Sequence, residues 1–226
     1  LGIGHMESAV ELKGEAQPDG PREQRGALDM LRDQARTFAG PVKVSLRETR
    51  ALGLTGAGRL GCATSLAVQL GGRHSPSDVC LALVCSPDTR ENARKLAWLP
   101  HARSTEGGGI QILDSEEAVS AWAARHMPEP SGDSFAVSSR VIVLALDPIS
   151  EQLAVLTILT ETWEACGEEG PRIIVTAVES AGLPGMCTAL VEIDGGDGVL
   201  WRQGDAAPVA FDASEVVGDD AVLAWT

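Results

Sequence analysis

A glycine-rich stretch in the first third of the chain has the residue types of a ligand-binding loop. Gly56, Gly58 and Gly61 fit the G-x-G-x-x-G spacing of a turn that binds the pyrophosphate of a dinucleotide. Gly56 and Gly61 also have the spacing of a phosphate-binding loop, G-x-x-x-x-G-K-S/T. In that alignment Cys62 stands at the lysine position and Ala63 at the position of the hydroxyl that binds magnesium. The loop therefore offers backbone N–H groups to an anion but lacks the cation and the metal ligand.

A second alignment of the same loop begins at Gly53. It places Arg59 at the lysine position but still puts Leu60 at the position of the hydroxyl. A phosphate-binding loop also works with an aspartate that follows a buried strand and orients magnesium. Asp147 follows the apolar run at 140–146, and Pro148 then stands where many ATPases have a glutamate that activates water. We therefore expect Gly56, Gly58, Gly61, Cys62, Ala63 and Asp147 to form a degenerate, vestigial nucleotide site with no catalytic residue.

The dinucleotide alternative requires an acidic residue for the ribose. Asp88 lies about 27 residues past Gly61, whereas the motif expects its acid about 20 residues past the glycines. It also follows a turn instead of standing at the tip of a strand. A single G-x-G-x-x-G is weak evidence, so an NAD(P)-binding oxidoreductase domain stays open as the less favoured alternative.

Composition excludes several other classes of function. The chain has 18 Lys and Arg against 32 Asp and Glu, for a net charge of −14, so we expect no nucleic-acid partner. Tyrosine is absent, and few aromatic side chains are available to stack on bases. No pair among the five cysteines has C-x-x-C spacing, so we expect no metal site. An odd number of cysteines without a framework favours a reducing compartment.

The elements that must position these residues alternate between strand and helix. Strands are predicted at 51–56, 78–86, near 112, at 140–147, at 171–180 and, as two or three, within 187–211, with a further edge strand at 42–46. Helices are predicted at 62–72, closed by its two final glycines, at 115–127 and at 150–167, and a helix or a turn followed by a helix at 87–99. Apolar residues also recur at helical spacing over 26–38. This alternation predicts an α/β fold: a mostly parallel sheet with helices on both faces and a small C-terminal β extension.

The N-terminal residues have a different character from the rest. Residues 1–6 contain "GHM" and are expected to be the remnant of an expression tag. Residues 7–25 are polar with Gly and Pro, as is typical of a flexible leader. No apolar run approaches the roughly 20 residues of a membrane span, and no signal peptide is visible.

Over about 26–226 the sequence resembles one region of the FtsK/SpoIIIE-type ATPases of actinobacterial type VII secretion systems, the EccC-like proteins. The resemblance is carried by the glycine turn, "HSPSD" at 74–78, "VCLALV" at 79–84 and "WLPH" at 98–101. It continues in "GPRIIV", "GLPGMCTALVEI" and the closing "DASEVVGDDAVLAW". The region is the degenerate module that precedes the first active ATPase domain, and this sequence departs from the active signature at both the lysine and the serine.

The resemblance implies a RecA-like, P-loop NTPase-like fold over 26–226 and a larger protein for protein transport. It implies a structural, regulatory or docking module that does not hydrolyse ATP and is not itself an enzyme, in a cytoplasmic domain of a membrane-associated protein. The partners would be neighbouring ATPase modules, membrane components of the secretion complex and other copies of the chain, with no cofactor. A domain that binds ATP without turnover is the nearer alternative.

Trp98, Leu99, Pro100 and His101 are the candidate residues for interaction. A Trp-Leu-Pro corner presents rigid apolar area, which is typical of the anchors that dominate interfaces. The competing interpretation is a tryptophan packed over the edge of the sheet, with Pro100 ending a helix.

Overall fold

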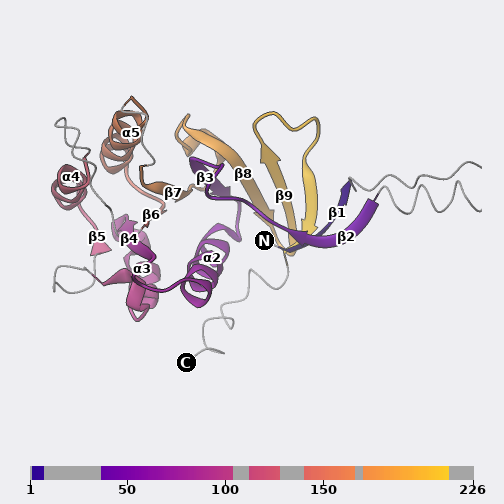
Figure 1. Ribbon diagram of the computed structural model, residues 1–226, viewed down its shortest axis with the longest axis horizontal. Coiled ribbons are helices and arrows are strands. Elements are labelled where there is room, and N and C mark those ends of the chain that lie inside the picture. The colour runs from indigo at the N-terminus through magenta and orange to yellow at the C-terminus, as the bar shows by residue number, and fades with distance from the viewer. Residues whose placement is uncertain (1, 8–36, 104–111, 128–139, 166–169, 214–226) are drawn as a thin grey trace, which may run out of the picture.

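The computed structural model describes residues 2–7, 37–103, 112–127, 140–165 and 170–213 (Figure 1). In this part of the chain one sheet holds ten strands in the order β2-β1-β10-β9-β8-β3-β7-β6-β4-β5. Its parallel part consists of β3 (Ala51–Thr55), β4 (Val79–Cys85), β5 (Ile112–Leu113), β6 (Arg140–Leu146), β7 (Arg172–Thr176) and β8 (Cys187–Asp194). Antiparallel pairing then adds β9 (Asp197–Arg202), β10 (Val209–Asp212), β1 (Gly2–Glu7) and β2 (Thr37–Val42).

Helices cover both faces of the parallel part, as the alternating sequence predicts. On one face lie α2 (Arg59–Arg73) and α3 (Arg90–Leu96), which pack in one core with Leu52, Leu54 and Val191 of the sheet. On the other face lie α4 (Glu116–Arg125) and α5 (Ser150–Ala165), which pack in a second core with Val143 and Val175. Strands buried on both faces explain the continuous apolar runs of β4 and β6. The predicted α/β fold with a C-terminal β extension is confirmed.

Most predicted elements form near their expected positions. The two or three strands predicted within 187–211 are the three strands β8, β9 and β10. Of the helix or turn-helix expected at 87–99, the structure has the second, a short 3-10 turn, Pro87–Thr89, followed by α3. The Ser115 side chain caps α4 by accepting a hydrogen bond from the backbone N–H of Ala118 (3.2 Å).

Three local predictions are wrong. The expected edge strand at 42–46 does not form, because the strand is β2, which pairs with β1 and ends at Val42 before the chain turns toward β3. Residues 37 and 38, expected at the end of a helical segment, lie in β2, and 26–36 lie outside the described residues. Gly71 and Gly72 do not close α2, which continues through them to Arg73.

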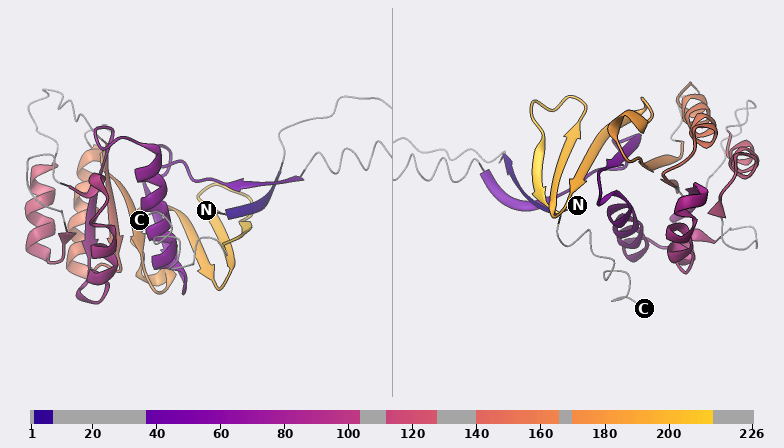
Figure 2. Two further views of the ribbon diagram at one scale, coloured as in Figure 1. Left: turned by 90° about the horizontal axis from the view of Figure 1, so that it is seen from below. Right: turned by 180° about the vertical axis from the view of Figure 1, so that it is seen from behind.

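Residues 2–7 lie in the sheet as strand β1. β1 pairs with both β10 and β2, and the β1–β2 pair is the part of the described sheet farthest from the helices (Figure 2). The origin of residues 1–6 stays a prediction, and 8–25 of the expected leader lie outside the described residues. Among the helices that the structure describes, none has the length and apolarity needed to cross a membrane.

Candidate functional site

The glycine turn connects β3 to α2 at the carboxyl edge of the parallel sheet, the edge where open α/β sheets bind ligands. Gly56 has φ +85°, and a Cβ added there would lie 2.2 Å from the carbonyl oxygen of Ile193 in β8. The backbone N–H of Gly58 donates to that same oxygen (3.2 Å), and the N–H of Gly56 donates to the carbonyl of Val178 (3.4 Å). Two N–H groups that could hold a phosphate are thus already bonded within the chain.

Cys62 and Ala63 lie in the first turns of α2, and both are fully buried in the core beneath the helix. Burial raises the pKa of the Cys62 thiol to about 12. Neither side chain can contact a ligand at the carboxyl edge. Of the two alignments of the loop, the geometry therefore favours the one that begins at Gly53 and places Arg59 at the lysine position.

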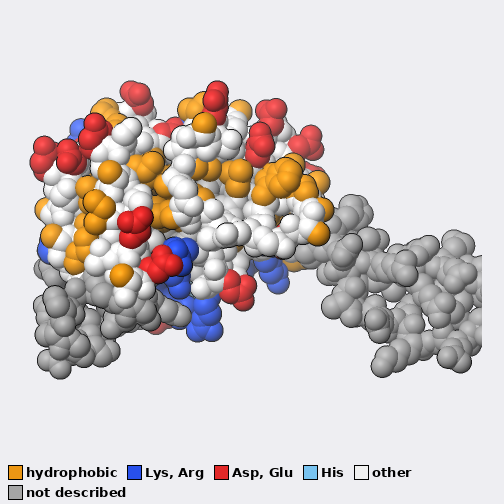
Figure 3. Space-filling view, turned by 90° about the horizontal axis from the view of Figure 1, so that it is seen from above, with side chains coloured by type: hydrophobic (Ala, Val, Ile, Leu, Met, Phe, Trp, Pro, Cys, Tyr) orange, Lys and Arg blue, Asp and Glu red, His pale blue; other side chains and the backbone are white. Residues whose placement is uncertain are grey.

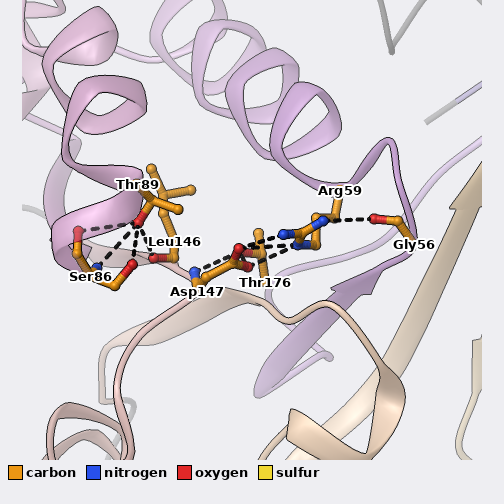
Figure 4. A network of polar contacts seen from close by, with 7 residues as sticks. All are labelled: Gly56, Arg59, Ser86, Thr89, Leu146, Asp147 and Thr176. Carbon is orange, nitrogen blue, oxygen red and sulfur yellow. Dashed lines mark hydrogen bonds and ion pairs between the residues drawn. The ribbon is translucent and has the colours of Figure 1, made fainter.

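Arg59 makes an ion pair with Asp147 across the gap between the glycine turn and the end of β6 (Figure 4). Its Nε donates to both carboxylate oxygens (2.9 and 3.2 Å) and its Nη2 donates to one of them (2.6 Å). Its Nη1 donates to the carbonyl oxygen of Gly56 (3.1 Å), which holds the guanidinium over the turn. The two side chains are only 16% and 20% exposed, so each charge is neutralised mainly by the other.

Asp147 is also held by Thr176 at the end of β7. The Thr176 hydroxyl donates to the Asp147 carboxylate and accepts the backbone N–H of Asp147 (2.7 Å). Burial of the carboxylate opposes its ionisation, but hydrogen bonds from Arg59 and Thr176 outweigh burial and lower the pKa of Asp147. The hydrogen bond to Asp147 in turn raises the pKa of Arg59. Asp147 also has φ +41°, a backbone conformation that is uncommon outside glycine.

Further polar side chains join the ends of neighbouring strands at this edge. The Thr89 hydroxyl donates to the carbonyl oxygen of Leu146 (2.6 Å) and accepts the N–H of Ser86 (3.2 Å), as Figure 4 shows. Fully buried Gln152 donates to the carbonyl of Cys85 (3.1 Å) and accepts the N–H of Ile149 (3.1 Å). Protein groups thus satisfy one another at this edge of the sheet.

Thr176, Thr89 and Gln152 are not among the site residues that the sequence predicts. Thr176 is the one buried polar residue of β7, and it ends that strand next to the strand that Asp147 follows, which is a signal that could have identified it. Thr89 and Gln152 carry no comparable signal, because threonine and glutamine are common at helix starts. Among the described residues no cluster of His, Cys, Asp and Glu could hold a metal ion.

The four candidate interaction residues have different environments. Leu99 and His101 are 3% exposed and pack on α2 at Gly71, where an added Cβ would lie 3.1 Å from Leu99 Cδ2. The Nε2–H of His101 donates to the carbonyl oxygen of His74 (2.9 Å). Trp98 is 42% exposed, and Pro100 is also exposed. Only the latter two are therefore available to a partner.

The strand order bears on the dinucleotide alternative. In a dinucleotide-binding fold the strand that follows the first helix lies next to the first strand. Here β6 and β7 lie between β3 and β4. Asp88 is exposed in the turn after β4, and two strands separate β4 from β3, which leads into the glycine turn. This order argues against an NAD(P) site.

No family model and no curated protein matches the sequence. Among the solved structures that are similar to this chain, three share 12% sequence identity with it. The cytoplasmic domain of the type VII secretion ATPase EccC from Thermomonospora curvata gives a TM-score of 0.56, over 77% of this chain and 25% of that chain. ATPases 2 and 3 of T. curvata EccC, in complex with a signal sequence peptide, give 0.53 over 77% and 38%. ATPases 2 and 3 of EssC from Geobacillus thermodenitrificans give 0.54 over 99% and 46%.

This chain therefore spans less than half the length of each neighbour. Its sheet order, its glycine turn at the start of α2 and these similarities agree on one architecture. The chain has the RecA-like α/β fold of the ATPase domains of type VII secretion.

Proposed function

We propose that this chain is a non-hydrolysing, ATPase-like structural module of a type VII secretion ATPase of the FtsK/SpoIIIE type. The observation that carries the proposal is the Arg59–Asp147 ion pair. Arg59 stands at the lysine position of the loop and Asp147 at the position of the acid that orients magnesium, and the two side chains bind each other. The parent protein would be membrane-associated, with this module on its cytoplasmic side next to other ATPase modules.

Loss of turnover follows from the groups at the site. Phosphoryl transfer is catalysed mainly by positioning and by neutralisation of charge. Leu60 has no hydroxyl to bind magnesium, and Pro148 has no group to orient water. Arg59 can neutralise a phosphate only by leaving Asp147, which would then remain charged and partly buried beside a polyanion.

Binding of Mg·ATP is also expected to be weak. The remaining attraction comes from the helix dipole and those loop N–H groups that are not already bonded, which contribute about 1–2 kcal/mol. A micromolar complex needs about 8 kcal/mol. The acidic chain, at −14, further opposes a polyanionic ligand.

A domain that binds ATP without turnover remains the second candidate. The observation that favours it is a cation, Arg59, at the lysine position of the loop.

A turnover assay tests the proposed function. Phosphate release from Mg·ATP is measured with the whole chain and with Asp147→Asn, which keeps the shape of the side chain but removes its charge. We expect the same background rate from both proteins. A rate that the wild-type chain shows and the variant loses would contradict the proposal.

A further inference from the structure

The β extension has a second face, which points away from α2. Val191, Leu200 and Phe211 of its three strands are buried in the core under α2. Side chains alternate between the two faces of a strand, so the residues next to these three point to the opposite face. Four of those residues are apolar and are half-buried or exposed, and we call them the extension face: Leu190, Val199, Trp201 and Ala210.

Strand pairing gathers these four side chains into one surface. Leu190 pairs with Trp201, and Val199 pairs with Ala210. Trp201 is 47% exposed. Among the described residues, the core under α4 and α5 takes its strand residues from β3 to β7 and from Cys187 at the start of β8, and none from β9 or β10. The described helices therefore leave the extension face uncovered.

The charged side chains around the extension face are acidic. Four carboxylates in the described part of β8, β9 and β10 alternate with buried residues and point to the same side as Trp201, namely Glu192, Asp194, Asp197 and Asp212. Arg202 alternates with Trp201 and points to the side of α2. Figure 3 looks from the side away from α2 and shows, over the β extension, a group of apolar side chains with acidic side chains next to it. A segment that fits this face should carry an apolar stripe with cations beside it.

The chain itself holds a segment of that kind. Residues 8–36, which lie outside the described residues, connect Glu7 at the end of β1 to Thr37 at the start of β2. Within them Leu28, Leu31 and Ala35 recur at helical spacing. On a helix, which turns about 100° per residue, these three side chains would fall within a sector of about 60°.

The arginines of the same segment would lie beside that apolar stripe. Arg25, Arg32 and Arg36 would fall within a sector of about 40°, next to Leu28. The two acids, Asp29 and Asp33, would lie on the far side of the arginines and therefore away from the apolar stripe. A helix over 25–36 thus has the apolar stripe and the flanking cations that the extension face calls for.

The lengths of chain also fit. Glu7 and Thr37 pair in register, so both ends of the segment lie at one end of the β1–β2 pair. The strand order β2-β1-β10-β9 puts β9 about 14 Å from β2. A helix over 25–36 would be about 18 Å long and would join Thr37 directly, so it reaches β9. Residues 8–25 can span up to about 60 Å, which is ample to connect Glu7 to the start of the helix.

We propose that residues 25–36 form an amphipathic helix that docks on the extension face of the same chain. Leu28, Leu31 and Ala35 contact Trp201 and its apolar neighbours, and the three arginines lie toward the carboxylates around them. Because the segment is attached to the sheet at both ends, it meets the face at a high effective concentration, so a small interface is sufficient. The inference goes beyond the proposed function, since the docking requires no nucleotide site.

Hydrogen exchange of the whole chain, resolved by mass spectrometry of its peptides, tests the docking. A helix of this length is marginal by itself, so protection of its amides requires a packed face. We expect the amides within 25–36 to exchange at least about tenfold more slowly than those of an unstructured chain. Trp201→Asp should remove most of that protection and leave exchange in β3 to β7 unchanged. Trp98→Asp, at a tryptophan of similar exposure (42%) just after α3, is the matched control and should keep the protection.

Cross-linking within the whole chain identifies the contact. Ala210→Cys is combined either with Leu31→Cys, on the apolar stripe, or with Asp33→Cys, which is nearer to β2 in sequence but lies on the opposite side of the helix. A short bismaleimide is added to dilute protein, and mass spectrometry locates the linked residues. We expect the first pair to link within one chain and the second pair to link far more slowly.

Exchange of 25–36 at the rate of an unstructured chain would overturn the proposal. Protection that persists in Trp201→Asp would also overturn it, because the segment would then pack elsewhere. Links that form only between two molecules would assign the face to a second copy of the chain, and a faster link at Asp33→Cys than at Leu31→Cys would turn the helix the other way; either result would contradict the proposed docking. None of these measurements involves ATP, so this inference and the proposed function can fail separately.

Discussion

Replacing Arg59 with alanine should destabilise the domain, although the residue lies at an edge of the sheet. The change removes every guanidinium contact to Asp147 and the one to the carbonyl of Gly56. Asp147, at 20% side-chain exposure, then keeps its charge with Thr176 as its main remaining partner.

The size of the loss follows from this partial burial. Breaking a fully buried pair costs about 3–5 kcal/mol, and an exposed pair contributes about 0.2–1 kcal/mol. With both side chains partly exposed, we expect Arg59→Ala to lower the free energy of unfolding by about 2 kcal/mol. In a domain of this size that corresponds to a fall in Tm of roughly 4–8 °C.

The loss should depend on pH with a defined sign. The pKa of Asp147 is lowered in the folded chain, so its contribution is present above the unfolded value near 3.9 and disappears as pH falls through the folded pKa. Urea unfolding of both proteins at pH 7 and at successively lower pH measures the difference. We expect a constant difference above about pH 5 that shrinks below about pH 4. A difference under about 0.5 kcal/mol at pH 7 would refute the reasoning, since that is the range of ordinary surface substitutions.

Two further predictions concern the glycine turn and α2. Gly56→Ala should lower the free energy of unfolding by more than about 2 kcal/mol, because alanine disfavours φ +85° and its Cβ would clash with the carbonyl oxygen of Ile193. Gly72→Ala should instead raise the free energy of unfolding by about 0.5–1 kcal/mol, because a Cβ at this position in α2 meets no atom within 4 Å. Urea unfolding compares the two, and equal effects would contradict the account of the turn. Cys62 should react with a thiol reagent at pH 8 only after denaturation, because its side chain is buried and its pKa is near 12. Mass spectrometry locates the labelled cysteines, and labelling of Cys62 in the native chain would show that the site is open.

The fold was predictable because its signals are local and strong. Continuous apolar runs such as 140–146 identify strands buried on both faces, and their alternation with helices fixes a parallel sheet. β2 was not predictable, because its pairing with β1 is a contact between distant residues that leaves no periodic pattern in "TFAGPV". Gly71 was misread as a helix end for a similar reason, since the close approach of Leu99 and His101 is a tertiary contact.

The site was predictable in its residue types but not in its geometry. The sequence shows that the loop lacks a lysine and a hydroxyl, and that Asp147 follows a buried strand. It leaves two alignments open, and only the burial of Cys62 and Ala63 decides between them. The pairing of Arg59 with Asp147 joins residues 88 positions apart, so spacing alone carries no sign of it.

The central claim is that the ion pair of the chain itself closes the nucleotide site. Calorimetric titration of the whole chain with Mg·ATP at millimolar concentration tests this claim most directly. The account predicts no saturable heat, because the N–H groups of Gly56 and Gly58 and the guanidinium of Arg59 already have partners. A dissociation constant below about 100 μM, which corresponds to more than about 5 kcal/mol of binding free energy, would contradict it.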